Sequence, residues 1–125
     1  MIPMNLSPDF ARRIRPSVDA ELAAARWHEL RGSADLALHH LERAHILGQA
    51  STRMHVRAHW AMLTWALRQR DLRELLGQAW RTAGAALKTW AWVPVGNTGR
   101  ANVSGFKPMP VPADLQQLID AARRP

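Results

Sequence analysis

The chain has 125 residues, enough for one domain with one modest hydrophobic core. It contains no cysteine, which excludes disulfides, thiolate metal sites and iron–sulfur clusters. The formal net charge is +7, but the 15 arginines are scattered and do not alternate with aromatic residues, which argues against nucleic acid as a partner. No signal-peptide pattern opens the chain and no apolar run reaches membrane-spanning length, so we expect a cytoplasmic protein with no membrane partner.

The first half of the chain predicts an irregular arm followed by two helices. The arm covers residues 1–16, and the first helix covers 17–31 with Ser17 as its N-cap. A second helix over 34–47 stops at Gly48, a residue type that commonly ends helices. The short link between the two helices indicates antiparallel neighbours.

The second half predicts two more long helices and then a change of character. Ser51 or Thr52 caps a helix over 53–69, and Asp71 with Glu74 makes a capping box for a helix over 72–90. Glycine and proline from 93 to 112 predict an ordered loop, and 113–125 predicts a short helix and tail.

These elements predict a single all-α domain over residues 1–125. Its helical core, residues 17–92, forms two stacked αα-hairpins, followed by a Gly/Pro-rich arm and a short final helix. The first two helices resemble one tetratricopeptide unit, because Gly32, Ala37, Leu41, Ala44 and Leu47 are spaced as in the second half of that repeat. Stacked hairpins of this kind share a continuous core and leave a groove on one side.

Histidine placement is the most informative feature of the sequence. All six histidines lie between His28 and His59. His55 and His59 are four residues apart, so both fall on one face of their predicted helix, inside an apolar arc that includes Met62 and Trp65. Two buried imidazoles need hydrogen-bond partners, a shared proton or a metal ion, because an unpaired buried polar group is costly.

The second helix carries a further histidine that shares a face with a carboxylate. Glu42 and His45 form a Glu-x-x-His pair, which is half of the ligand set of helical-bundle di-metal sites. The chain has only one such pair and four glutamates, so a mononuclear site is the better prediction. His40 falls on the apolar arc of this helix, away from Glu42 and His45.

Two interpretations of the histidines remain open. In the first, His45, His55 and His59 bind a metal ion, with Glu42 or Glu29 as the carboxylate and His40 as a further candidate. Imidazole and carboxylate suit zinc, copper, nickel, cobalt or iron. In the second, the same side chains form a buried hydrogen-bonded network without a metal. No nucleophile motif is present, which favours a binding protein over an enzyme.

The Gly/Asn-rich segment after the fourth helix is a second unusual feature. Its residues permit positive φ, so that backbone N–H groups could converge on an anion; the alternative is a tight loop packed on the helices. We expect residues 93–105 to be ordered and to close one end of the histidine-bearing groove. The residues expected near the site are Gly96, Asn97, Thr98, Gly99 and Asn102.

Three strings carry a family resemblance: His-Leu-Glu-Arg-Ala-His-Ile-Leu-Gly-Gln at 40–49, His-x-x-x-His-Trp at 55–60, and Gly-Asn-Thr-Gly at 96–99 with Ala-Asn-Val-Ser at 101–104. In this combination the chain resembles an uncharacterised bacterial family catalogued as domain of unknown function 3703. The family has no established activity, and its members tend to be encoded near heavy-metal efflux and metal-responsive regulator genes. The resemblance therefore implies a role in metal tolerance for a protein that binds one divalent transition metal.

Two functions follow as hypotheses. A metal-binding protein should lose affinity below about pH 6.5, because imidazole must be neutral to bind. The alternative is a cofactor-free interaction module that uses the hairpin groove to hold a partner peptide or a second copy of the chain.

Overall fold

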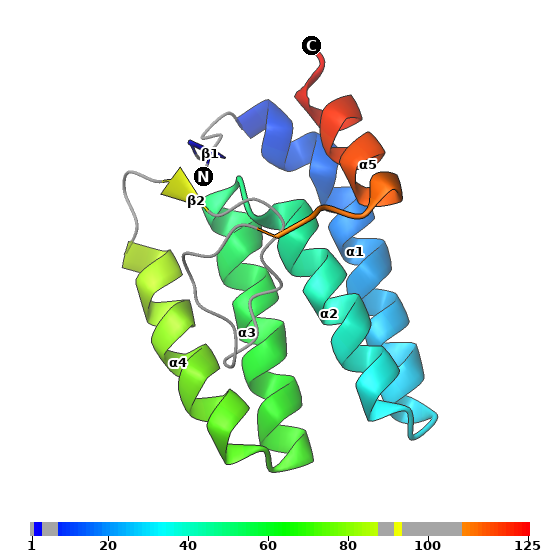
Figure 1. Cartoon of the computed structure of the whole chain (residues 1–125), viewed down its shortest axis with the longest axis vertical. Helices are drawn as coiled ribbons and strands as arrows, with labels where there is room; N and C mark the ends of the chain where they lie inside the picture. The colour runs from blue at the N-terminus through cyan, green and yellow to red at the C-terminus, as the bar shows by residue number, and fades with distance from the viewer. Residues whose placement is uncertain (1, 4–7, 88–91, 94–108) are drawn as a thin grey trace.

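The structure, a computed structural model, describes residues 2–3, 8–87, 92–93 and 109–125 (Figure 1). Over these residues the protein is helical apart from one short strand pair, which confirms the all-α prediction. The elements are β1 (Ile2–Pro3), α1 (Pro8–Leu30), α2 (Ala34–Gly48), α3 (Thr52–Gln69), α4 (Leu72–Leu87), β2 (Trp92–Val93) and α5 (Ala113–Arg123). In the part of the chain that is described, no helix combines the length and the apolar character needed to cross a bilayer.

Helix α1 is longer than its sequence predicts. It begins at Pro8 and continues through Pro16, so the predicted arm over 1–16 and the predicted N-cap at Ser17 are wrong from residue 8 onward. An internal proline removes one helical hydrogen bond and disfavours a continuous helix. Burial offsets this cost, because one face of the helix on both sides of the proline enters the core through Phe10, Ile14 and Val18.

The next three helices begin and end close to their predicted bounds. Ser51 is the N-cap of α3, and its side-chain oxygen accepts a hydrogen bond from the Met54 N–H at 3.5 Å. Helix α4 is described to Leu87, and the predicted residues 88–90 lie outside the described residues. The loop residues expected near the site, 96–99 and 102, also lie outside them.

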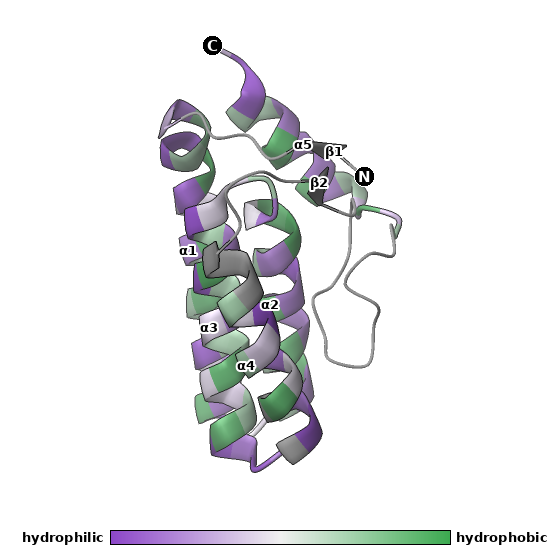
Figure 2. Cartoon of the chain, turned by 90° about the vertical axis from the view of Figure 1, so that its left-hand side faces the viewer, coloured by the Kyte–Doolittle hydropathy of each residue, from purple (hydrophilic) through white to green (hydrophobic). Residues whose placement is uncertain are grey.

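Helices α1 and α2 pack against each other, as do α3 and α4, and α2 also contacts α3 (Figure 1). Helix α5 packs on α1 and α2, where Leu115, Ile119 and Ala122 enter the main hydrophobic cluster. A second cluster joins α1, α2 and α3 around Leu41 and Trp65. Each long helix therefore carries hydrophobic and hydrophilic residues side by side along its length (Figure 2).

The strand pair is a feature that the sequence does not predict. Strands β1 and β2 are antiparallel, with Ile2 opposite Val93 and Pro3 opposite Trp92. The start of the chain thus meets the segment that follows α4.

Candidate metal centre

Three histidines meet where α2 ends and α3 begins. His45 lies in the last turn of α2, and His55 and His59 lie in the first half of α3. Their exposed fractions are 2%, 7% and 3%, so all three imidazoles are withdrawn from solvent. We call His45, His55 and His59 the histidine triad.

A close approach of the two helices brings the triad together. A Cβ added at Gly48 would lie 2.7 Å from the Cβ of Met54 and 3.1 Å from its carbonyl carbon, closer than side chains normally come. Gly48 was expected only to end α2, but its missing side chain is also what lets α2 and α3 touch. His45 precedes this contact by three residues and His55 follows it by one.

The three Nε2 atoms of the triad form a nearly equilateral triangle. The distances from His45 to His59, from His45 to His55 and from His55 to His59 are each 3.1 Å. When three nitrogens bind one ion at about 2.0–2.1 Å, neighbouring donors are about 2.8–3.4 Å apart, from an octahedral face to a tetrahedron. The triad therefore has the spacing of three ligands on one transition-metal ion.

Helix α4 supplies a hydrogen-bonded support for His59. The His59 Nδ1 lies 2.6 Å from the Gln78 Oε1, and the Gln78 Nε2 donates to the Glu74 Oε2 at 3.1 Å. The carboxylate fixes the orientation of the amide, so the amide oxygen faces His59. Because that oxygen can only accept, the proton of a neutral His59 is on Nδ1 and its Nε2 presents a lone pair.

Both residues of this support are buried, and Glu74 lies in the first turn of α4. Gln78 is fully buried and Glu74 is 6% exposed. The predicted capping box is half formed: Asp71 accepts from the Glu74 N–H at 3.1 Å, whereas the Asp71 N–H donates to the Ala66 carbonyl. The Glu74 side chain is thereby used for Gln78. Sequence reasoning missed Gln78, because its spacing from Glu74 indicates only that these two side chains share a face of α4 and not that Gln78 meets His59.

Burial also acts on the cation near Glu74. Burial lowers the pKa of Arg81, and the negative charge of Glu74 acts in the opposite direction. The negative charge of Glu74 and the positive charge of Arg81 therefore partly compensate each other.

The structure places the other predicted site residues elsewhere. Glu29 binds Arg68 through two hydrogen bonds of 2.5 and 2.9 Å, and these bonds hold its pKa below the usual value. The His40 Nδ1 lies 2.6 Å from a Glu21 oxygen. Glu42 is half-buried on α2 and is not part of the group of converging donor atoms.

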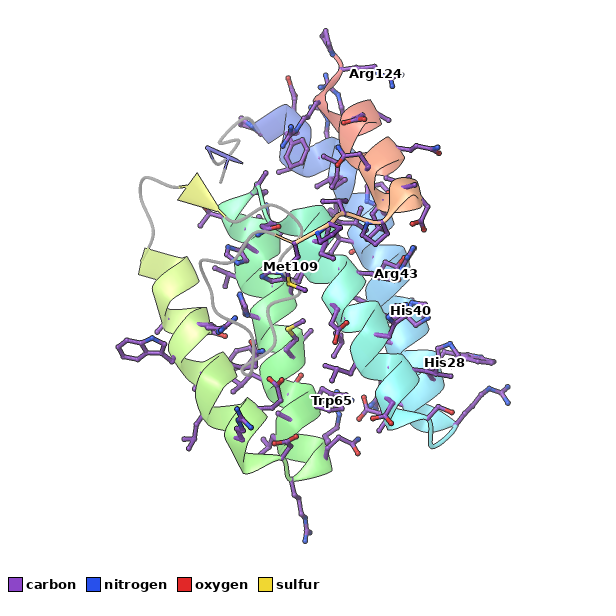
Figure 3. All side chains as sticks on the ribbon, viewed as in Figure 1. His28, His40, Arg43, Trp65, Met109 and Arg124 are labelled. Carbon is purple, nitrogen blue, oxygen red and sulfur yellow. The ribbon has the colours of Figure 1, made fainter. Side chains whose placement is uncertain are left out.

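The remaining histidines form a separate surface group. The rings of His28 and His40 stack at 5.1 Å between centroids, and His39 lies edge-on to His40. His28 and His40 lie on the α1 and α2 side of the molecule, away from α4 (Figure 3). The six histidines are thus divided equally between the buried triad and this surface group.

Comparison with known proteins gives one match. No curated protein and no solved structure matches the chain. The sequence model of the family described as "Protein of unknown function (DUF3703)" matches residues 12–119. That range covers the triad and all five helices apart from the first turn of α1 and the last turn of α5. The chain therefore belongs to the DUF3703 family.

Proposed function

We propose that this protein binds one divalent transition-metal ion through the Nε2 atoms of the histidine triad. The observation that carries the proposal is the triangle of buried imidazole nitrogens with edges of 3.1 Å. Three imidazoles suit zinc, copper(II), nickel, cobalt or iron better than ions that prefer thiolate. The role that follows is a cytoplasmic buffer, sensor or chaperone in metal tolerance, in keeping with the gene neighbourhoods that the family resemblance implies.

A metal-free hydrogen-bonded network accounts less well for the triangle. A neutral Nε2 either donates or accepts, and each hydrogen bond needs one of each. Three mutual contacts cannot all join a donor to an acceptor, because among three atoms two must be alike. At least one pair of like groups would then face each other at 3.1 Å in a buried site.

A bound cation removes this conflict. With His59 protonated on Nδ1 by its contact with Gln78, its Nε2 already presents a lone pair. If His45 and His55 adopt the same form, all three lone pairs stabilise one positive charge. The geometry therefore supports a metal site over a cofactor-free core.

Metal analysis of the untagged protein tests the proposal. Purified without a histidine tag, it should contain about one equivalent of metal by elemental analysis or take up zinc, cobalt, nickel or copper stoichiometrically by calorimetry. The variant His55→Ala/His59→Ala should lose this binding. The matched control His28→Ala/His39→Ala removes as many imidazoles from the surface group and should bind as wild type does. Absence of binding in the wild type, or equal loss in both variants, would refute the proposal.

A cleft between α1 and α3 favours a second candidate function. It has a volume of about 170 Å³ and is lined by apolar residues, among them Leu22, Ala25 and Leu41, and by polar ones that include the ion-paired Glu29 and Arg68. Two stacked hairpins of tetratricopeptide-like arrangement would place a peptide or a second copy of the chain along such a cleft. This interaction module predicts a dimer by light scattering and no loss of self-association in the triad double variant.

A further inference from the structure

The sequence limits what else can join the triad. Every histidine, aspartate and glutamate of the chain lies within the described residues, and the chain has no cysteine. Among these side chains, the donor atoms of the triad converge, and no fourth histidine, aspartate or glutamate belongs to the same group. No fourth imidazole, carboxylate or thiolate of the same chain therefore reaches the site.

The charges around the triad also leave a bound divalent ion without a neutralising protein ligand among the converging side chains. Imidazole is neutral when it binds a metal, so three of them leave the full charge of a divalent ion in place. Glu74 is the one buried carboxylate of the chain, and it is not among the donor atoms that converge with the triad; the neutral amide of Gln78 lies between it and His59. A buried ion with this surplus charge is stabilised by an anionic ligand.

Three protein ligands with one further position is a recognised type of site. Structural zinc sites are closed by four protein ligands, whereas sites with three histidines keep a position for water or another small ligand. The triad has the donor number and donor type of the second group. The edges of 3.1 Å are shorter than the roughly 3.5 Å of a planar set of three donors, so the three nitrogens would lie on one side of an ion that they bind.

We infer that the metal ion held by the triad keeps one coordination position for an exogenous ligand, and that this position takes water or a small anion with a nitrogen or oxygen donor. The inference rests on the proposed function, because it concerns the same ion. It changes the character of the site from a closed structural centre to one that recognises a small anion through the metal.

Azide added to the cobalt-loaded protein tests the inference. Cobalt(II) is bound by the same ligands as zinc and its visible absorption reports on its coordination. With azide we expect a shift of these bands that saturates and follows a single-site binding curve. Sodium perchlorate at the same ionic strength, which coordinates weakly, should leave the bands unchanged.

Two controls locate the effect. His28→Ala/His39→Ala should show the same azide shift as wild type, because the surface histidines are not involved. A shift that disappears in this variant would place the azide complex at the surface and overturn the inference. Light scattering across the titration should show one unchanged molecular mass. A mass that changes with azide would mean that a second copy of the chain supplies the fourth ligand, and this result would also overturn the inference.

The outcomes separate the two proposals. If cobalt binds stoichiometrically and saturating azide leaves the spectrum unchanged, the protein itself completes the coordination; the inference then fails while the proposed function stands. If cobalt does not bind at all, the proposed function fails as well.

Discussion

Substitution of Gly48 by alanine should damage the triad without touching a histidine. The added Cβ would lie 2.7 Å from the Met54 Cβ, whereas ordinary contact begins at 3.4 Å, so α2 and α3 must separate by up to about 0.7 Å. Overpacking of this kind costs about 1–3 kcal/mol. Alanine recovers about 0.5–1 kcal/mol through its better helix propensity. We therefore expect a net loss of up to about 2.5 kcal/mol in the free energy of unfolding.

The same movement should weaken metal binding. Functional groups must be held within about 0.5 Å of their productive positions, and the separation displaces His45 relative to His55 by a comparable distance. We expect zinc affinity to fall roughly tenfold or more, similar to the loss of an outer-sphere partner. Urea unfolding in the absence of metal measures the first effect, and calorimetric titration with zinc measures the second.

Gly32 provides the control for general destabilisation. It has a φ of +80°, and a Cβ added there would meet nothing within 4 Å. Gly32→Ala should cost about 1 kcal/mol through backbone strain alone, and its zinc affinity should equal that of the wild type. If Gly48→Ala binds zinc as tightly as the wild type, the close approach of α2 and α3 does not position the triad.

Three further predictions concern the supports of the fold and site. Gln78→Leu removes the acceptor of His59 and should lower zinc affinity about 10–100-fold by calorimetry; unchanged affinity would contradict its role. Zinc at a hundred times its dissociation constant should stabilise the fold by about 2.7 kcal/mol in thermal melts, and a similar gain in the triad double variant would contradict specific binding. Glu29 has a lowered pKa because Arg68 binds it, so its contribution is present above pH 4.5 and is lost as the pH falls through the lowered value. The stability difference between wild type and Glu29→Gln should therefore shrink in acid. If urea unfolding gives the same difference above pH 4.5 and below the lowered pKa, Glu29 does not contribute in this way.

The triad could be predicted because its signal is local. The spacing of His55 and His59 places both on one apolar face, and His45 is joined to them through a short turn. Gln78 could not be predicted in the same way, because its contact with His59 depends on how α3 and α4 pack. Periodicity defines which face of a helix is buried, but it does not define which residue of the neighbouring helix lies opposite.

Other differences between expectation and structure have the same origin. His40 has an apolar wheel position, yet Glu21 of the neighbouring helix binds it and keeps it in the surface group. Pro16 would end an isolated helix, but the burial of Phe10 and Val18 on either side holds α1 together. In both cases packing between helices outweighs a preference that the local sequence expresses.

The short separation of the triad along the chain has a consequence for how the protein folds. His45 is 10 residues from His55 and 14 from His59, so the site closes a small loop. Closing such a loop costs little chain entropy, and contacts of this kind form fast. The corner between α2 and α3 can therefore assemble before α5, which comes last in the chain, docks on α1 and α2. An ion captured at this corner would join α2 to α3, and the segment from residue 45 to 59 alone supplies its three imidazoles.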